Sequence, residues 1–312
     1  MSIRRDSWRR ARRIGFFLFL AVVAWLLARY AMAVDWAQVA HALRSYSGGA
    51  IVAALSLTLA SYLVYCGYEL AARTYSRHGL PTPRVMAIAG IVYAFSLNVG
   101  AVVGGAGLRY RLYSHEGLAL GTISRIAAFA VATNWLGYLL LTGALFAAGQ
   151  VAMPVSWGWS GTGLRWLGVA MLSGVTVYLV ACASAHDRVF HVRGHHFRLP
   201  TLSLALLQLL LATGNWALMG WLLNLLMPPA LGYTAVLGAL LVAAVASAIA
   251  HIPAGIGVIE AVFLALFGHT VPAPQLLAAL LAYRACYYLV PLMLAVPGYA
   301  VLESGSRRKP QA

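Results

Sequence analysis

Hydrophobic residues fill eight long stretches of this chain, and short polar or basic segments separate them. A membrane-spanning helix needs about 20 consecutive, mostly apolar residues, and most of the stretches reach this length. The stretches cover residues 14–34, 49–70, 85–107, 126–148, 164–185, 200–227, 230–268 and 274–302. The pattern predicts an all-α, polytopic membrane protein with one membrane domain, residues 14–302, between a basic N-terminus, 1–13, and a basic tail, 303–312.

The third stretch is broken by glycines and runs into basic residues. Gly104, Gly105 and Gly107 come at its end, and Arg109 and Arg111 follow directly. Backbone that leaves the helix at membrane depth must be satisfied by protein or by a water-filled cavity. Glycines at this spacing also permit close helix packing, but packing does not require the arginines. We therefore interpret this segment as a hairpin tip beside a binding site.

The seventh stretch is broken in a similar way and runs into an acid. Pro253 removes an amide donor, and Gly255 and Gly257 free the backbone, shortly before Glu260. Interrupted helices at corresponding positions in two halves of a chain are the sequence signature of a transporter site.

Composition and charge distribution argue against a soluble globular protein. The chain is 62% hydrophobic and 9% charged, and its mean hydropathy is +0.81. A net charge of +15 would suggest a nucleic-acid partner in a soluble protein. Here the arginines lie in short loops beside predicted spans, which favours a topological meaning and no nucleic-acid partner. The three cysteines lie in apolar segments, so we interpret them as buried apolar residues.

The distribution of positive charge selects a topology with six spanning helices and two re-entrant hairpins. If 85–107 and 230–268 are hairpins, five regions face the cytoplasm, and they contain 18 of the 22 arginines and lysines. Those regions are 1–13, 71–84, 108–125, 186–200 and 303–312. Eight full spans would instead place several basic loops outside, against the positive-inside rule. We expect an uncleaved first span and a cytoplasmic location for both termini.

This topology contains an internal symmetry. Residues 14–148 and 164–302 each hold two spans, a hairpin and a further span, and the two halves have opposite orientations. Such an inverted repeat is the plan of many secondary transporters.

Five charged residues are candidates for substrate binding. Arg109, Arg111 and Arg125 flank the first tip, and guanidinium groups bind phosphate through paired hydrogen bonds. The alternative is ordinary interfacial anchoring. Glu260 and Arg284 are both expected at membrane depth, where charges are costly and usually paired. We predict that they pair with each other, either beside the substrate or as a structural link that fixes the hairpin.

The remaining polar residues receive structural interpretations. Glu69 is expected to pair with Arg73 one helical turn later. Amides in the apolar segments are expected to link helices. These are Asn98, Asn134, Gln208, Asn215 and Asn224. The histidines of residues 186–196 lack further ligands, so we expect no metal. No phosphate-binding, dinucleotide-binding or nucleophile motif is found, so we expect neither cofactor nor enzymatic activity.

At its two broken segments the chain resembles the transmembrane region of the bacterial lysylphosphatidylglycerol synthase/flippase family and related stand-alone inner-membrane proteins. The resemblance rests on Gly104-Gly105-Ala106-Gly107-Leu108-Arg109-Tyr110-Arg111-Leu112-Tyr113 and Pro253-Ala254-Gly255-Ile256-Gly257-Val258-Ile259-Glu260. The second segment departs from the family pattern at Ala254, where glycine is usual, and at Ile259, where phenylalanine is usual. The resemblance implies a domain that binds or moves phospholipid. Synthase activity is not expected. In that family it belongs to a soluble aminoacyl-transferase domain, and residues 1–312 contain no segment that we interpret as such a domain.

The sequence thus predicts a multi-pass protein of the bacterial inner membrane that binds or translocates a phospholipid or similar amphiphile. The expected partners are membrane lipids, anionic or modified phospholipid above all. A second copy or a lipid-modifying enzyme are further candidates. Two alternatives stay open. One is a secondary transporter for a small solute, and the other is a non-transporting partner of a lipid-modifying enzyme.

Overall fold

Helices make up nearly all of the described chain. The computed structural model describes residues 44–306 apart from 152, 155–156, 186–188, 193–194 and 251–252, together with positions 37 and 41. The predicted first span, 14–34, and the basic N-terminus lie outside the described residues. The helical elements are α3 (Gly48–Ser76), α4 (Thr82–Val99), η1 (Ala101–Gly107), α5 (Leu108–His115), α6 (Leu120–Ala147), α7 (Gly161–Ala185), α8 (Leu202–Leu226), α9 (Tyr233–Ala250), η3 (Pro253–Gly255), α10 (Val258–Phe267), α11 (Ala273–Arg284), η4 (Ala285–Leu289) and α12 (Val290–Ser306).

Local signals set several helix ends. Ser47 and Thr201 cap α3 and α8, because each side chain accepts a hydrogen bond from a backbone amide of the first turn. Pro81 and Pro272 precede α4 and α11 in extended conformation. Arg77 ends α3 in the left-handed conformation, with φ of 56°. Apolar sequence fills the helices between these signals, so most observed bounds agree closely with the predicted stretches.

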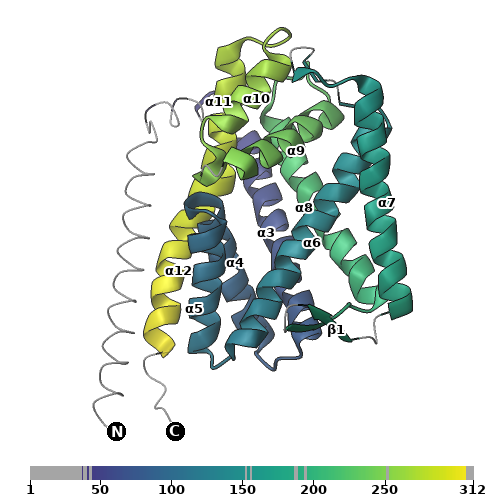
Figure 1. Ribbon diagram of the computed structural model, residues 1–312. Coiled ribbons are helices and arrows are strands. Elements are labelled where there is room, and N and C mark those ends of the chain that lie inside the picture. The colour runs from purple at the N-terminus through teal and green to yellow at the C-terminus, as the bar shows by residue number, and fades with distance from the viewer. Residues whose placement is uncertain are drawn as a thin grey trace, which may run out of the picture.

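The described chain contains seven helices that are long and apolar enough to cross a membrane. This confirms the predicted class, a polytopic all-α membrane protein. In Figure 1, α3, α6, α7, α8 and the continuous α11–η4–α12 element run along the length of the bundle. We call the end where α3 and α5 finish and α6 begins the basic end, because arginines gather there. The count of six spans stays a prediction, because the first of them lies outside the described residues.

Two helix pairs turn back inside the bundle instead of running its full length (Figure 1). We call α4–η1–α5 the first hairpin and α9–η3–α10 the second hairpin. The first hairpin begins and ends at the basic end, and the second begins and ends at the opposite end. Their tips therefore approach each other in the middle of the molecule.

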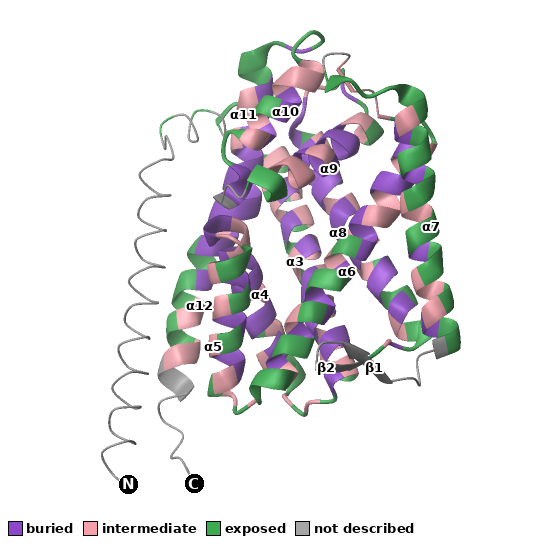
Figure 2. Ribbon diagram, in the orientation of Figure 1, coloured by how far each residue is buried: buried purple, intermediate pink, exposed green. Residues whose placement is uncertain are grey.

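The core is densest where α3 and α8 pack against each other, close to the two tips. Figure 2 shows the buried residues gathered on the inner faces of the helices. The outer face of α7 is exposed and apolar, with Trp166 70% and Val177 68% exposed. A helix with such a face fits a lipid environment better than water.

The basic loop predicted at 186–200 contains a small antiparallel β-hairpin. Its strands are β1 (Val189–Val192) and β2 (His195–Arg198), with Val189 opposite Arg198. This was not predicted, because short apolar and histidine residues in a basic loop give a weak strand signal. The cysteines are free and buried, as expected.

Candidate functional site

The first hairpin turns at Gly100. This residue has φ of 101° and ψ of 159°, a conformation that favours glycine, and it ends α4. A π-helical turn, η1, follows and leads into the short return arm α5. Arg84 near the start of α4 pairs with Glu116 just after α5, so the outer ends of the two arms lie together.

The predicted tip glycines lie just after this turn. Gly104 packs so closely on α4 that an added Cβ atom would lie 2.3 Å from the carbonyl oxygen of Phe95. An added Cβ atom on Gly105 would lie 3.0 Å from Ser96 Oγ. Gly107 precedes α5 in helical conformation. The close-packing interpretation therefore describes Gly104, while Gly100 makes the break itself.

The second hairpin turns through three residues with positive φ angles. Ala254, Gly255 and Gly257 have φ of 57°, 59° and 81°. Pro253 begins this turn as the first residue of η3. The left-handed angle at Ala254 gives a physical reason for glycine to be favoured at that position, since a Cβ atom is strained there. An added Cβ atom on Gly255 would lie 2.6 Å from Ser247 Oγ on the first arm.

Glu260 and Arg284 form the predicted ion pair. Arg284 Nε lies 2.8 Å from Glu260 Oε1, and Arg284 Nη2 lies 3.1 Å from Oε2, a two-point contact. The same guanidinium donates to the carbonyl oxygens of Ala254 at 2.9 Å and Gly255 at 3.1 Å. Glu260 Oε2 also accepts a hydrogen bond from the Gly257 amide. One arginine on α11 thus holds both the acid and the buried, non-helical backbone of the second tip.

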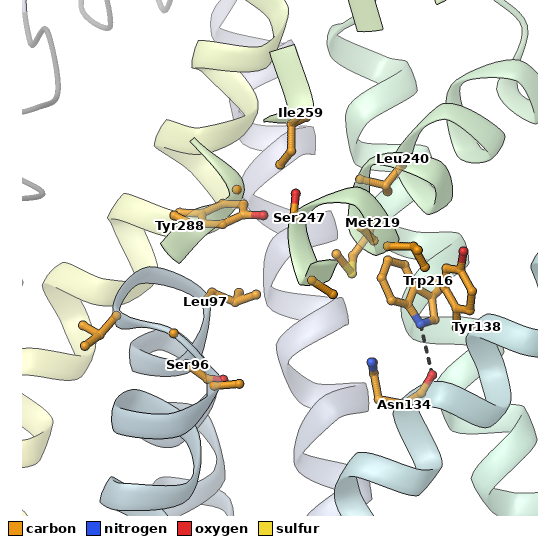
Figure 3. Close-up of a pocket in the computed structure, with 18 of the residues that line it drawn as sticks. Ser96, Leu97, Asn134, Tyr138, Trp216, Met219, Leu240, Ser247, Ile259 and Tyr288 are labelled. Carbon is orange, nitrogen blue, oxygen red and sulfur yellow. Dashed lines mark hydrogen bonds between the residues drawn. The ribbon is translucent and has the colours of Figure 1, made fainter. Parts of the chain in front are cut away.

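A cavity of about 550 Å³ lies between the two tips. Its volume is in the range of small-molecule sites, ~300–1,000 Å³. Figure 3 shows Ser96 and Leu97 of the first hairpin facing Ser247 and Ile259 of the second across this space, with Tyr138 and Trp216 on one side. The lining is mainly apolar. No lining residue in the described part of the chain is charged.

Both tips are hydrogen-bonded to the helix that contains a second π-helical turn, η4. This turn begins one residue after Arg284, and π-helical turns leave carbonyl groups that need other donors. Asn98 of the first hairpin donates to the Tyr288 carbonyl at 3.2 Å, and Tyr62 donates to the Tyr287 carbonyl at 3.3 Å. The first hairpin is therefore bonded to the same helix that holds the second, four residues away.

A closed ring of hydrogen bonds lies beside this turn. Ser61 Oγ donates to Asn215 Oδ1 at 2.7 Å, and Asn215 Nδ2 donates to Tyr93 OH at 3.4 Å. The Tyr287 hydroxyl completes the ring, 2.8 Å from Tyr93 OH and 2.7 Å from Ser61 Oγ. All four residues are buried and come from α3, α8, α4 and η4. The linking role of Asn215 was predicted from the sequence, but the role of the tyrosines was not, because their only signal was their position in apolar segments.

Comparison with known proteins identifies the family of the chain. Residues 14–295 match the family described as the lysylphosphatidylglycerol synthase TM region. The chain belongs to this family. The match covers both hairpins and every span predicted from the sequence except the end of the last.

Two relatives extend along nearly the whole chain. The chain is 45% identical over 309 residues to the inner membrane protein YbhN of Escherichia coli K12, covering 99% of this chain and 97% of that protein. It is 27% identical over 280 residues to an uncharacterized protein of a Synechocystis strain, covering 88% and 87%. The first relative and the apolar helices identify a multi-pass inner-membrane protein.

Arg109 lies in a different place from the one predicted. We expected residues 108–125 to be a cytoplasmic region, but Arg109 lies in the return arm α5 and is 4% exposed. Arg109 Nη2 lies 2.6 Å from Glu69 Oε1, and Tyr113 OH donates to Glu69 Oε2 at 2.9 Å. The predicted pair of Glu69 with Arg73 is therefore wrong. A fully buried carboxylate needs a buried cation, and Arg73 instead donates to Thr82.

Arg111 and Arg125 differ in their surroundings. Arg111 pairs with Glu303 of α12 through Nη2 and Oε1, 2.5 Å apart. Arg125 is exposed and donates to Thr122 Oγ1 at 3.3 Å. In the described part of the chain, Arg109 and Arg111 are engaged with carboxylates, while Arg125 has no carboxylate partner. The predicted role of these arginines and of the Glu260–Arg284 pair in substrate binding stays a prediction.

Proposed function

We propose that the protein binds a phospholipid in the cavity between the two hairpin tips and moves it between the leaflets of the inner membrane. The observation that carries the proposal is the cavity itself. Its rim includes Val102, 80% exposed, and Trp135, 43% exposed, and these side chains would face lipid. A cavity with an apolar rim at mid-membrane depth suits an amphiphile better than a hydrated solute.

The lining supports contact with the uncharged part of the lipid. Ser96, Asn134 and Ser247 supply the side-chain polar atoms near the two tips. Ser247 Oγ is buried without a hydrogen-bond partner in the described structure, so a ligand oxygen there would satisfy it. An ester or hydroxyl group of a lipid has the required chemistry. A charged headgroup would meet no opposite charge among the described lining residues.

The hairpin arrangement supports alternating access to the two leaflets. The first hairpin enters from the basic end and the second from the opposite end, and this opposite orientation supports the proposal of an inverted repeat. By the positive-inside rule the basic end would face the cytoplasm. Movement of one tip would then open the cavity towards one leaflet. The proposal requires no chemical reaction by this chain.

The test is lipid movement in proteoliposomes that contain a fluorescent phosphatidylglycerol and an impermeant quencher. Ala244→Phe places a ring in the cavity from α9 and should slow movement at least tenfold. Ala170→Phe on the exposed face of α7 is the matched control and should leave the rate unchanged. Equal rates in both variants, with both proteins folded, would contradict the proposal, as would a rate no higher than that of empty liposomes.

A further inference from the structure

The described lining of the cavity between the tips offers hydrogen bonds but no charge. Its polar side chains are hydroxyl, amide and indole groups. Arg284 donates to the carbonyls of the lining residues Ala254 and Gly255, but it is paired with Glu260 and brings no unbalanced charge to the tip. An ionised group that entered the cavity would therefore lose its hydration without meeting an opposite charge among the described lining residues, which is costly.

Three lining side chains are available to a ligand, and they come from three different elements. Ser247 Oγ of α9 is buried without a hydrogen-bond partner in the described structure. Asn134 of α6 accepts the Trp216 indole N–H at its backbone carbonyl, 3.3 Å away, so this bond leaves its side-chain amide unused. Ser96 of α4 faces Ser247 across the cavity (Figure 3).

The chemistry of these side chains selects the kind of group that can bind. A serine hydroxyl donates and accepts, and an asparagine amide carries both a donor and an acceptor. Phosphate and ester oxygens accept hydrogen bonds but donate none, and an ammonium group donates but accepts none. A hydroxyl group does both and carries no charge. Several hydroxyl groups on one headgroup can therefore use all three side chains at once.

Three aromatic rings form a continuous wall from the rim of the cavity to its interior. Trp135 at the rim is 43% exposed, whereas Tyr138 and Trp216 are buried. The ring centroids of Trp135 and Tyr138 are 5.4 Å apart and those of Tyr138 and Trp216 are 5.8 Å apart, and both pairs are edge-to-face. The C–H groups of a sugar ring pack well against aromatic faces, which carry partial negative charge. Such packing leaves the hydroxyl groups of the sugar free to form hydrogen bonds.

We propose that the cavity receives a lipid whose headgroup is uncharged and rich in hydroxyl groups, such as a sugar, in preference to a charged phospholipid headgroup. The inference rests on the proposed function, because it takes the cavity as the site of the moving lipid, and it specifies the headgroup. Ser96 and Ser247 bind headgroup hydroxyls from the two hairpins, and Asn134 binds another from α6. A free sugar has the same hydrogen-bonding groups, so the experiment separates the two sources.

The experiment compares two fluorescent lipids in proteoliposomes, a monoglucosyl diacylglycerol and phosphatidylglycerol, both labelled on an acyl chain and followed with an impermeant quencher. After subtraction of the rate in protein-free liposomes, the glucolipid should move about tenfold faster, because no ionised group has to enter the cavity. Ser96→Ala/Ser247→Ala should lower the ratio of the two rates about fivefold, the effect of one neutral hydrogen bond. Ser173→Ala/Ser184→Ala on the exposed face of α7 is the matched control and should leave the ratio unchanged.

The serine variant is expected to fold, because Ser247→Ala removes a hydroxyl that has no partner in the described structure. Phosphatidylglycerol that moves as fast as the glucolipid would overturn this inference and leave the proposed function standing. A ratio that does not change in Ser96→Ala/Ser247→Ala would overturn it as well. The same liposomes loaded with radiolabelled glucose should retain it as protein-free liposomes do. Release of glucose without movement of the glucolipid would overturn the proposal in favour of a free solute.

Native mass spectrometry separates failure of this inference from failure of the proposed function. If neither lipid moves faster than in protein-free liposomes, the proposed function fails. The protein in micelles that contain equal amounts of the two lipids should still retain the glucolipid in preference, and this preference should shrink in Ser96→Ala/Ser247→Ala. Equal retention of the two lipids by the unaltered protein would overturn the inference about the headgroup.

Discussion

The ion pair at the second tip gives the sharpest energetic prediction. The side chains of Arg284 and Glu260 are only 8% and 20% exposed, so each charge depends on the other. Removing one partner of a buried pair typically costs about 3–5 kcal/mol, because an uncompensated charge is left behind. Arg284 also holds the carbonyls of Ala254 and Gly255, so Arg284→Gln should be the more damaging variant. We expect about 4 kcal/mol for it and about 2–3 kcal/mol for Glu260→Gln.

The double variant Glu260→Gln/Arg284→Gln tests whether the pair is coupled. Its cost should fall below the sum of the single costs by at least ~1 kcal/mol, because no unpaired charge remains. The assay is reversible unfolding in mixed micelles, followed by far-ultraviolet circular dichroism. Additive costs, with a coupling energy under about 0.5 kcal/mol, would refute the reasoning. If the pair also works in transport, lipid movement should stay low in the double variant although no unpaired charge remains.

Four further predictions concern the hairpins and their orientation. Gly104→Ala should destabilise the protein by at least ~2 kcal/mol, because the added Cβ atom would clash with backbone. The control is Gly90→Ala, where an added Cβ atom meets nothing within 4 Å, and it should be neutral or stabilising. Equal thermal midpoints of the two variants would contradict this. Ala254→Gly should raise the free energy of unfolding by about 0.5–1 kcal/mol, because relief of the left-handed strain exceeds the added entropy of the unfolded chain; a decrease would count against the observed turn. Glu69→Gln should cost about 3–5 kcal/mol by leaving a buried guanidinium unpaired, and a cost under about 1 kcal/mol would mean that the pair is not intact. A cysteine at Ser114 should be shielded from an impermeant outside reagent in intact cells, and labelling from outside would reverse the proposed orientation.

Hydrophobic length was enough to predict the class of protein, and the glycine breaks were enough to predict which two apolar stretches are interrupted. These features depend on local sequence, since a long apolar run and a proline–glycine break act within a few residues. The Glu260–Arg284 pair was also predictable, because two charges at membrane depth leave each other as the main partner. The family pattern has glycine at the position of Ala254, and the structure gives Ala254 a left-handed φ angle. The usual glycine of the pattern therefore has a backbone reason.

The contacts of Arg109 could not be predicted in the same way. Its partner, Glu69, lies 40 residues earlier, and nearest-neighbour spacing pointed to Arg73 instead. The expected hairpin ended before Arg109, so the return arm α5 was assigned to a cytoplasmic region. The ring through Tyr93 and Asn215 was missed for a related reason, since its members come from four elements, α3, α4, α8 and η4, that meet only in the folded bundle.

The two hairpins are held to very different degrees, and this difference suggests which one moves. Among the described residues, three arginine–carboxylate ion pairs hold the first hairpin: Arg84–Glu116 joins its arms, and Arg109 and Arg111 attach α5 to α3 and α12. Among the described residues of the second hairpin, one such pair is found, Glu260–Arg284. Displacement of Arg284 alone would release both the acid and the tip carbonyls, whereas breaking any one of the three arginine pairs of the first hairpin leaves two in place. We therefore expect faster amide hydrogen exchange in η3 and α10 than in η1 and α5, and we expect Glu260→Gln to increase exchange in the second hairpin alone. Equal exchange in both tips, before and after the substitution, would mean that the number of ion pairs does not determine which hairpin moves.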